Sequence, residues 1–429
     1  MTTALRRPYV RLAFFLALGG CYDQPFVPGN EADDRVSITN DEFELGQRVT
    51  YPETDIPIDP GPPATAGPMG VPGFGSVGPS LAPGSIKLTL KAEAAPPMVS
   101  GQTLQATAVW QSSGNRAVVS YAVAGAPALG GVDLFQVLGS GEPRLRSSAT
   151  FTDSDVFGVS MDDAYVYLAQ ASADPARPSP AVVERILIDA NKLTLATSAQ
   201  AQLGSFAATS AASTGTTLYA TSGSNGSVYA VDPSDMSIVG EYALDHARWV
   251  ALDPAGGRIV VAQGMPGRLS LFEEGAFPGG SMNLQATYSL PGADVAESKT
   301  TVEVHGGKAF VAAGPAGVQI VCLADGQVIG SVPRPDPAEV GLDPSVVVTN
   351  AVTVQDDLMF ISNGEAGVYA AAGASSFDTD GCTPPSISVL GKLRFDDLQS
   401  VNHVAWLGDE LYVAAGLGGI KIVRVQLGR

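Results

Sequence analysis

Short runs of alternating apolar and polar residues, separated by glycine turns, recur through residues 85–429. In each of seven copies an aromatic or apolar residue is followed four positions later by glycine, or in one copy by alanine. Alternation over four to eight residues predicts a strand, and glycine supplies the backbone angles of tight turns. Each copy therefore predicts a strand, a turn and a second strand. The copies begin at Tyr121, Tyr167, Tyr219, Val260, Phe310, Phe360 and Tyr412.

The length of the repeat indicates how many strands it holds. Successive copies lie about 40–52 residues apart, a spacing typical of propeller blades with four strands each. The last cycle has room for strands at 385–395, 401–407, 411–415 and 420–425. No copy has a convincing helical period. We therefore expect an all-β fold, a seven-bladed β-propeller over residues 85–429.

The two ends of this region predict how the ring closes. The chain stops after the third strand of the seventh repeat, and a spare strand at Ser85–Lys91 precedes the first repeat. An open end would leave a row of unpaired backbone N–H and C=O groups. We therefore expect the N-terminal strand to complete the final blade.

Two of the repeats resemble a known family. Phe310–Val321 (FVAAGPAGVQIV) and Tyr412–Val423 (YVAAGLGGIKIV) are similar to the LVIVD repeat of bacterial surface propellers. The resemblance covers about residues 85–429 and is clearest in repeats five to seven. The acid that usually ends the motif is present as Asp232 but absent at Val425. The resemblance implies a propeller in the cell envelope and no particular reaction.

Residues 1–20 have the features of a signal peptide. A basic start with Arg6, Arg7 and Arg11 precedes a short apolar run that cannot span a bilayer. The run ends in Leu18-Gly-Gly-Cys21, which resembles a bacterial lipobox and implies a lipid on Cys21. An ordinary signal peptide is the alternative, and Sec or twin-arginine export stays open. We expect an exported protein, lipid-anchored in the bacterial cell envelope.

Residues 21–84 differ in composition from the repeats. The first part, 22–60, is acidic, and 57–84 is rich in proline and glycine. Such a segment buries little apolar surface to offset the entropy of ordering. We expect a disordered linker between anchor and propeller, in which residues 43–51 are a candidate for docking at an unspecified place.

The net charge and the absence of common catalytic motifs narrow the classes of function that the sequence allows. The net charge is −19, from 24 Lys and Arg against 43 Asp and Glu, which disfavours binding to nucleic acid. The sequence has no Gly-x-Ser-x-Gly elbow, phosphate loop or dinucleotide fingerprint. We expect no cofactor, and the question of enzymatic activity stays open with non-enzymatic binding favoured.

The first strand of each blade lines the central channel, and its register places polar residues at one mouth. Such residues could hold a small ligand or a cation, although any channel rim is wet and polar. The three histidines lie at unlike heights, so we expect no metal site. The candidate ligand-binding residues are Arg248, Thr300, Asn350, Asn402 and His403.

Loops on the same face as the glycine turns form a candidate partner surface, with a plain solvated rim as the alternative. Their acids are Asp294, Glu297, Asp336, Glu339 and Asp343. Cys322 and Cys382 are expected on the opposite face of adjacent blades, where a disulfide and two separate thiols both stay open.

Two functions follow from these features. The first is a non-enzymatic, lipid-anchored scaffold, monomeric, whose propeller binds a protein or glycan at the envelope. The second is an extracytoplasmic, calcium-dependent hydrolase of the lactonase-like propeller class. Asn350 and Asn402 would suit calcium, whereas Arg248 places a cation where the metal would lie.

Overall fold

The computed structural model describes residues 31–32, 34–60, 86–112, 115–137, 141–296, 298–395 and 400–428. The signal segment 1–20, the lipobox Cys21, residues 61–85 and Glu297 lie outside the described residues. No helix in the described part of the chain is long and apolar enough to cross a membrane.

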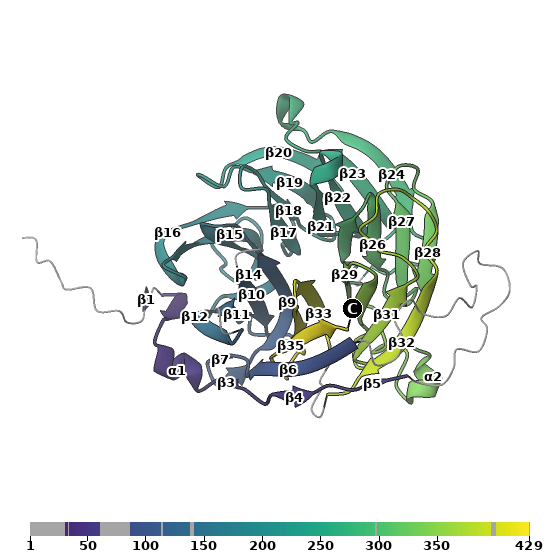
Figure 1. Ribbon diagram of the computed structural model, residues 1–429. Helices are drawn as coiled ribbons and strands as arrows, with labels where there is room; N and C mark the ends of the chain where they lie inside the picture. Colours follow the sequence, from purple (N-terminus) through teal and green to yellow (C-terminus); the bar gives the residue numbers. More distant parts are fainter. Residues whose placement is uncertain are drawn as a thin grey trace, which may run out of the picture.

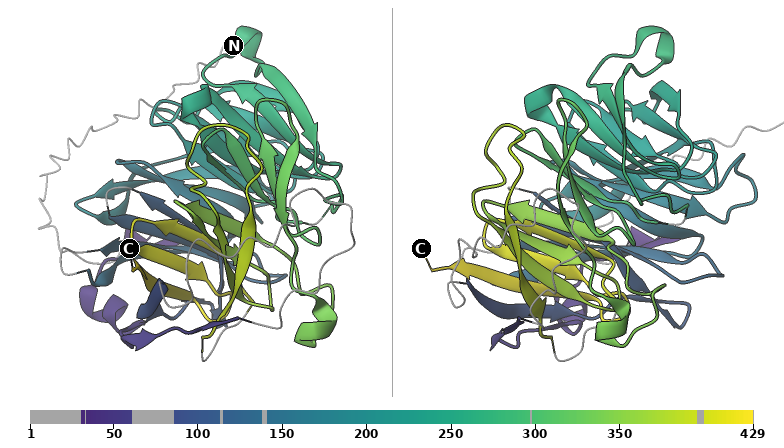
Figure 2. Two further views of the ribbon diagram at one scale, coloured as in Figure 1. Left: turned by 45° about the vertical axis from the view of Figure 1, so that its right-hand side comes forward. Right: turned by 90° about the vertical axis from the view of Figure 1, so that its right-hand side faces the viewer.

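The described residues form seven antiparallel sheets around a central axis, as the repeat predicts (Figure 1). Each sheet contains one blade of four strands, which run in chain order from the axis outward in every blade but the last, and three of the sheets carry further strands at their outer edge. Neighbouring inner strands contact each other all the way round, so the ring is closed. The side views show strands running through the thickness of the ring, with loops gathered on two opposite faces (Figure 2).

The strand bounds are as follows, from inner to outer. Blades one to three are β9 (Gln105–Ser112), β10 (Arg116–Ala122), β11 (Gly130–Val137) and β12 (Pro143–Phe151); β13 (Ser154–Met161), β14 (Tyr165–Ser172), β15 (Ala181–Asp189) and β16 (Lys192–Gln202); β17 (Ser210–Ser213), β18 (Leu218–Thr221), β19 (Ser227–Val231) and β20 (Ile238–Ala243).

Blades four to six are β21 (Ala247–Asp253), β22 (Arg258–Gly264), β23 (Gly267–Glu273) and β24 (Leu284–Ser289); β25 (Val302–His305), β26 (Lys308–Ala312), β27 (Val318–Cys322) and β28 (Val328–Val332); β29 (Ala351–Gln355), β30 (Leu358–Ser362), β31 (Val368–Gly373) and β32 (Ile387–Leu393). Blade seven is β33 (His403–Leu407), β34 (Glu410–Ala414), β35 (Ile420–Leu427) and β6 (Ile86–Ala94). A small hairpin, β7 (Met98–Val99) with β8 (Gln102–Thr103), follows β6.

Blade seven confirms the predicted closure. Its three inner strands come from the C-terminal end of the chain and its outer strand, β6, from the N-terminal side. β6 and β35 are antiparallel from the pair Ile420–Ala94 to the pair Leu427–Ile86. Leu88 and Leu90 of β6 are buried against the last blade. The ring is thus joined by backbone hydrogen bonds along a whole strand.

The residues that begin each repeat are buried in the second strand of their blade. They pack between neighbouring blades, as where Tyr412 meets Phe135 edge-on with ring centroids 6.4 Å apart. The glycine turn beside them is sterically required. At Gly419, φ is +69°, and a Cβ would lie 2.1 Å from the carbonyl oxygen of Ala94. This explains why the glycines recur with the aromatic residues.

The expectation of a disordered linker is wrong for residues 34–60, which we call the N-terminal strap. β2 (Val36–Thr39) pairs with β12, and β1 (Glu31–Ala32) pairs with β2. Next, α1 (Glu42–Gly46) lies against β12. β3 (Val49–Thr50) and β4 (Thr54–Asp55) pair with β6, and β5 (Ile58–Asp59) pairs with β32. The strap therefore adds strands to the outer edges of blades one, seven and six (Figure 1).

Apolar burial explains why an acidic segment is ordered here. Val36, Ile38, Leu45 and Ile56 are buried against the blades, although acids separate them in the sequence. Asp41 caps α1 by accepting hydrogen bonds from the backbone N–H groups of residues 43 and 44. The candidate docking segment 43–51 lies within the strap, against blades one and seven.

Candidate functional site: the axial channel and its mouth

One face of the ring carries the loops that lead from the outer strand of one blade to the inner strand of the next. It also carries the turns between second and third strands, so we call it the entry face. The inner strands start here, and the predicted channel-mouth residues lie at their first positions. Three of them, Arg248, Asn350 and Asn402, have specific hydrogen-bond partners in the structure.

The two predicted asparagines join neighbouring blades. Asn350 donates from Nδ2 to the carbonyl oxygen of Val401 at 3.1 Å, and Asn402 donates to that of Ala106 at 2.8 Å. Thr301 makes the equivalent bond from Oγ1 to the carbonyl oxygen of Asn350 at 3.0 Å. These side chains hydrogen-bond the backbone of the next blade, so their first role in the structure is to hold the inner strands together.

Arg248 lies at a bulge between Ala247 and Trp249, where the inner strand of blade four begins. Its Nη2 donates to Ser224 Oγ at 3.0 Å and to the carbonyl oxygen of Ala296. It lies 3.2 Å from His246 Nδ1. Arg248 therefore links the entry loops of blades three, four and five instead of standing alone at the rim.

A lysine that the register argument did not single out crosses the channel. Lys299 precedes the inner strand of blade five, yet its Nζ donates to the carbonyl oxygens of Thr107 in blade one and Asn402 in blade seven. The Nζ–O distance to Asn402 is 3.3 Å. Neither blade is a neighbour of blade five, so the side chain reaches across the axis.

The surroundings of Lys299 destabilise its charge. Burial lowers the pKa of its ammonium to about 7, and no charged group among the described residues offsets this effect. Solvent still touches part of Lys299, as well as Asn350 and Asn402. The ammonium is thus largely enclosed by protein, although Lys299 keeps some exposure to solvent.

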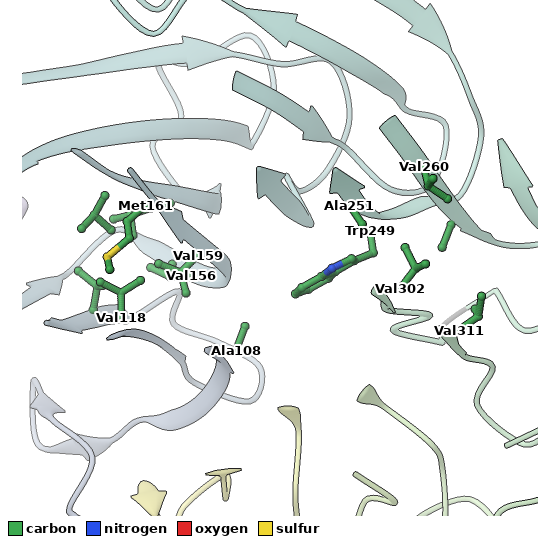
Figure 3. Packing of buried hydrophobic residues seen from close by; sticks show 14 of the residues in the cluster. Ala108, Val118, Val156, Val159, Met161, Trp249, Ala251, Val260, Val302 and Val311 are labelled. Atoms are coloured by element: carbon green, nitrogen blue, oxygen red, sulfur yellow. The ribbon is translucent and has the colours of Figure 1, made fainter. Parts of the chain in front are cut away.

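An aromatic stack joins the inner strands of blades four and seven across the central space. Trp249 of blade four and His403 of blade seven are stacked, with ring centroids 5.1 Å apart and an interplanar angle of 27°. Both are buried. Figure 3 shows the Trp249 ring extending from its strand into the central space, facing Val156 and Ala108 of other blades. His403, predicted as a ligand residue, is therefore part of an internal plug.

The electrostatics of His403 follow from this position. Burial, and then the nearby charge of Lys299, holds the pKa of His403 well below its usual value, so the imidazole is neutral. Its Nδ1 is buried and has no hydrogen-bond partner among the described residues. A buried polar atom without a partner calls for a specific explanation.

Thr300, the remaining predicted channel residue, is strained. Its φ is +45°, a left-handed value that β-branched residues rarely adopt. It is completely buried, and its Oγ1 has no hydrogen-bond partner within the described chain. Residues held in such conformations concentrate at functional sites. Lys299, Thr300 and His403 together form an unusual cluster, which we call the channel cluster.

The predicted partner-face acids are exposed, and most also shape their own loops. Asp294 Oδ1 accepts from the N–H of Gly267 at 2.8 Å. Asp336 caps the short helix α2 (Pro337–Val340), which contains Glu339. Asp343 accepts from the N–H and Oγ of Ser345, which lowers the pKa of Asp343. The fifth acid, Glu297, lies outside the described residues.

The opposite face carries the two cysteines. Cys322, at the end of β27, forms a disulfide with Cys382, in the loop after β31, with Cα atoms 5.4 Å apart. Nearby, His305 lies between Glu303 and Asp378, at 2.7 and 3.0 Å. Burial lowers the pKa of His305, but the two carboxylates outweigh burial, so the pKa is raised. In the described ranges, no three His, Cys, Asp or Glu side chains are grouped to hold a metal.

No family model and no curated protein matches this chain. Among solved structures, the WD40 propeller domain of Doa1 is similar at a TM-score of 0.49 and 9% identity, over 77% of this chain and 95% of that one. A putative 6-phosphogluconolactonase from Bacteroides uniformis is similar at a TM-score of 0.48 and 11% identity, over 71% and 94%. The designed protein Ika8 is similar at 0.45 and 11% identity, over 79% and 93%. These values indicate nothing about the activity of this chain.

Proposed function

We propose that the protein is a non-enzymatic, lipid-anchored scaffold of the bacterial cell envelope whose propeller binds a protein or glycan on its entry face. The proposal rests on the hydrogen bonds that the side chains at the channel mouth make within the protein. Asn350 and Asn402 hold neighbouring blades together, and the Lys299 ammonium lies on backbone oxygens between them. A rigid ring with a filled axis is suited to presenting loops.

The entry face has the composition of a recognition surface. Exposed apolar side chains lie on four of its loops, and the exposed acids described above lie on two others. A face that offers both apolar and charged groups can contribute to binding another protein. The apolar residues are Met98, Phe206, Met265 and Leu417.

The alternative, a calcium-dependent hydrolase, gains no support from this geometry. Calcium requires six to eight oxygen ligands around one point. At this mouth the candidate amides donate to backbone carbonyls, and a cationic side chain uses the carbonyl oxygens that face the axis. A second cation would meet the charge of Lys299.

The proposed location in the cell envelope rests on the sequence. The lipobox at Cys21 and the similarity of two repeats to the LVIVD family both support it. Metabolic labelling of a bacterial host with an alkyne fatty acid tests the anchor. The full chain is expected to incorporate the label, and Cys21→Ser is expected to lose it and leave the membrane fraction. Equal labelling of both would contradict the anchor.

Crosslinking capture from detergent-solubilised envelope tests the binding face. Phe206→Ser combined with Leu417→Ser alters two entry-face loops, whereas Ile238→Ser combined with Val389→Ser alters two exposed apolar residues on outer strands. The first variant is expected to lose a specific crosslinked species that the second retains. Retention of that species by both variants would contradict the entry face as the binding surface.

A further inference from the structure

We propose that the channel cluster is a binding site for a small carboxylate, held by Lys299 at the mouth of the axial channel. This site lies on the axis and is separate from the loop surface proposed for a macromolecular partner. Three features of the cluster lead to it: an incompletely used ammonium, two buried polar atoms without partners, and a nearby aromatic stack.

The first feature is the hydrogen bonding of Lys299. A lysine ammonium has three N–H donors. Two are directed to the carbonyl oxygens of Thr107 and Asn402, which carry no full charge. The third donor is left for a ligand, and a buried ammonium is stabilised by a counter-ion. A carboxylate supplies both the acceptor and the opposite charge.

The second feature is the pair of unsatisfied polar atoms. Thr300 Oγ1 adjoins Lys299 in the chain, and His403 Nδ1 belongs to a ring close enough to be influenced by the lysine charge. A hydroxyl and a neutral imidazole can each donate a hydrogen bond. A carboxylate has two oxygens, so it can accept from the lysine and from one of these groups together. The strain at Thr300 is consistent with a position held for binding.

The third feature limits the size of the ligand. The stacked rings of Trp249 and His403 each follow a mouth residue, Arg248 or Asn402, by one position along their strands, and Lys299 is partly exposed. A ligand that enters from the entry face would therefore meet Lys299 before the aromatic stack. This favours a short monocarboxylate, as a free acid or as the C-terminus of a peptide chain.

One charged group of the entry face binds the loop that leads to Lys299, since Arg248 donates to the carbonyl oxygen of Ala296. The guanidinium of Arg248 lies at the rim of blade four, in a protein whose net charge is −19. Local positive potential in an acidic protein favours the entry of anions. Glu297 is close in sequence but outside the described residues, so the experiment includes Glu297→Gln.

The test is NMR of the whole mature protein carrying ¹³C at lysine Cε. Sodium acetate replaces sodium chloride at constant ionic strength. Acetate is expected to shift the Lys299 resonance saturably and to raise its pKa, since a bound anion favours the charged amine. N-acetyl-triglycine, whose only charge is its C-terminal carboxylate, tests the peptide source. A response to acetate supports a free acid, and a response to the peptide alone supports a chain terminus.

Variants give a second readout by thermal unfolding. Acetate is expected to raise the Tm of the wild type, of Glu297→Gln and of Lys299→Arg, which keeps the charge. Lys299→Met is expected to lose the rise, and Lys87→Met, on an exposed strand position, to retain it. The proposal is overturned if neither carboxylate shifts the Lys299 resonance, if chloride alone gives the same shift, or if Lys299→Met keeps the full rise in Tm.

Discussion

The guanidinium of Arg48, in the N-terminal strap, lies against the carboxylate of Asp133, which is completely buried in blade one. Nη1 and Nη2 of the arginine approach Oδ1 and Oδ2 at 3.1 and 2.5 Å, and Nη1 also donates to Ser148 Oγ at 3.1 Å. Arg35 of the strap binds Glu184 of blade two, another fully buried carboxylate, in the same two-pronged way. The strap thus provides the counter-ions of two buried acids.

This arrangement predicts a large loss of stability in Arg48→Met. Removing one partner of a buried ion pair leaves an uncompensated charge and costs about 3–5 kcal/mol. Arg394→Met is the matched control, because Arg394 also binds the strap, through Asp59, but at an exposed site. An exposed pair contributes about 0–1 kcal/mol. Urea unfolding of both variants checks this, and equal midpoints would contradict the role of Arg48.

Closure of the ring predicts a second cost. Leu88→Ala removes a buried side chain from the strand that completes blade seven. A buried leucine truncated to alanine costs about 2–5 kcal/mol. Lys87→Ala, one residue earlier and exposed, is expected to change the stability by no more than about 0.5 kcal/mol. Differential scanning calorimetry measures both. A negligible effect of Leu88→Ala would show that β6 contributes little to closure.

His305 predicts a pH dependence with a defined sign. Its pKa in the folded protein is raised above the unfolded value of about 6.5. Its ion pairs with Glu303 and Asp378 therefore stabilise the fold fully below about pH 6.5, and this contribution is lost as pH rises through the folded pKa. Thermal unfolding of His305→Gln should show a deficit in acid that disappears at alkaline pH. A deficit independent of pH would contradict this account.

The ionised form of Glu410 is expected to destabilise the fold, whereas the charged form of His305 stabilises it. Burial, reinforced by the charge of Asp409, raises the pKa of Glu410 to about 7, although Arg424 Nη2 lies 3.6 Å from Glu410 Oε1 and opposes the shift. An acid with a raised folded pKa destabilises the fold as pH rises from its unfolded to its folded value. Glu410→Gln should therefore be more stable than the wild type above pH 7 by about 1–3 kcal/mol, and equal to it in strong acid. Asp409→Asn removes the charge that reinforces the shift, so it should give a smaller gain of the same sign above pH 7, measured by urea unfolding.

The repeat was the most informative part of the sequence. The aromatic positions and glycine turns indicate seven blades because each glycine is required where two strands approach closely, as at Gly419. The spare strand before the first repeat was predicted to close the ring because an unpaired edge at Val425 would be unfavourable. The number of blades and the closing strand both depend on local backbone geometry, and the alternation of apolar residues and the turn residues indicate that geometry directly.

The strap could not be found in the same way. Its strands β3, β4 and β5 have two residues each, too short for any periodicity, and its arginines acquire their role only when distant acids are buried beside them. The channel was predicted only in part. Register placed Asn350 and Asn402 at the mouth but did not give their partners, and it passed over Lys299, which lies in a loop. Contacts across the axis link blades far apart in sequence and leave no local pattern.

The route of the strap has a mechanical consequence. Followed from its start, the strap lies on blade one, then on blade seven, and finally on blade six, all before the chain reaches the closing strand β6. Tension applied to the N-terminal end would first have to peel β2 and α1 away, and then the short strands on the other two blades. A force on the N-terminal end would therefore have to break these outer contacts before it reached the pairing of β6 with β35 that closes the ring.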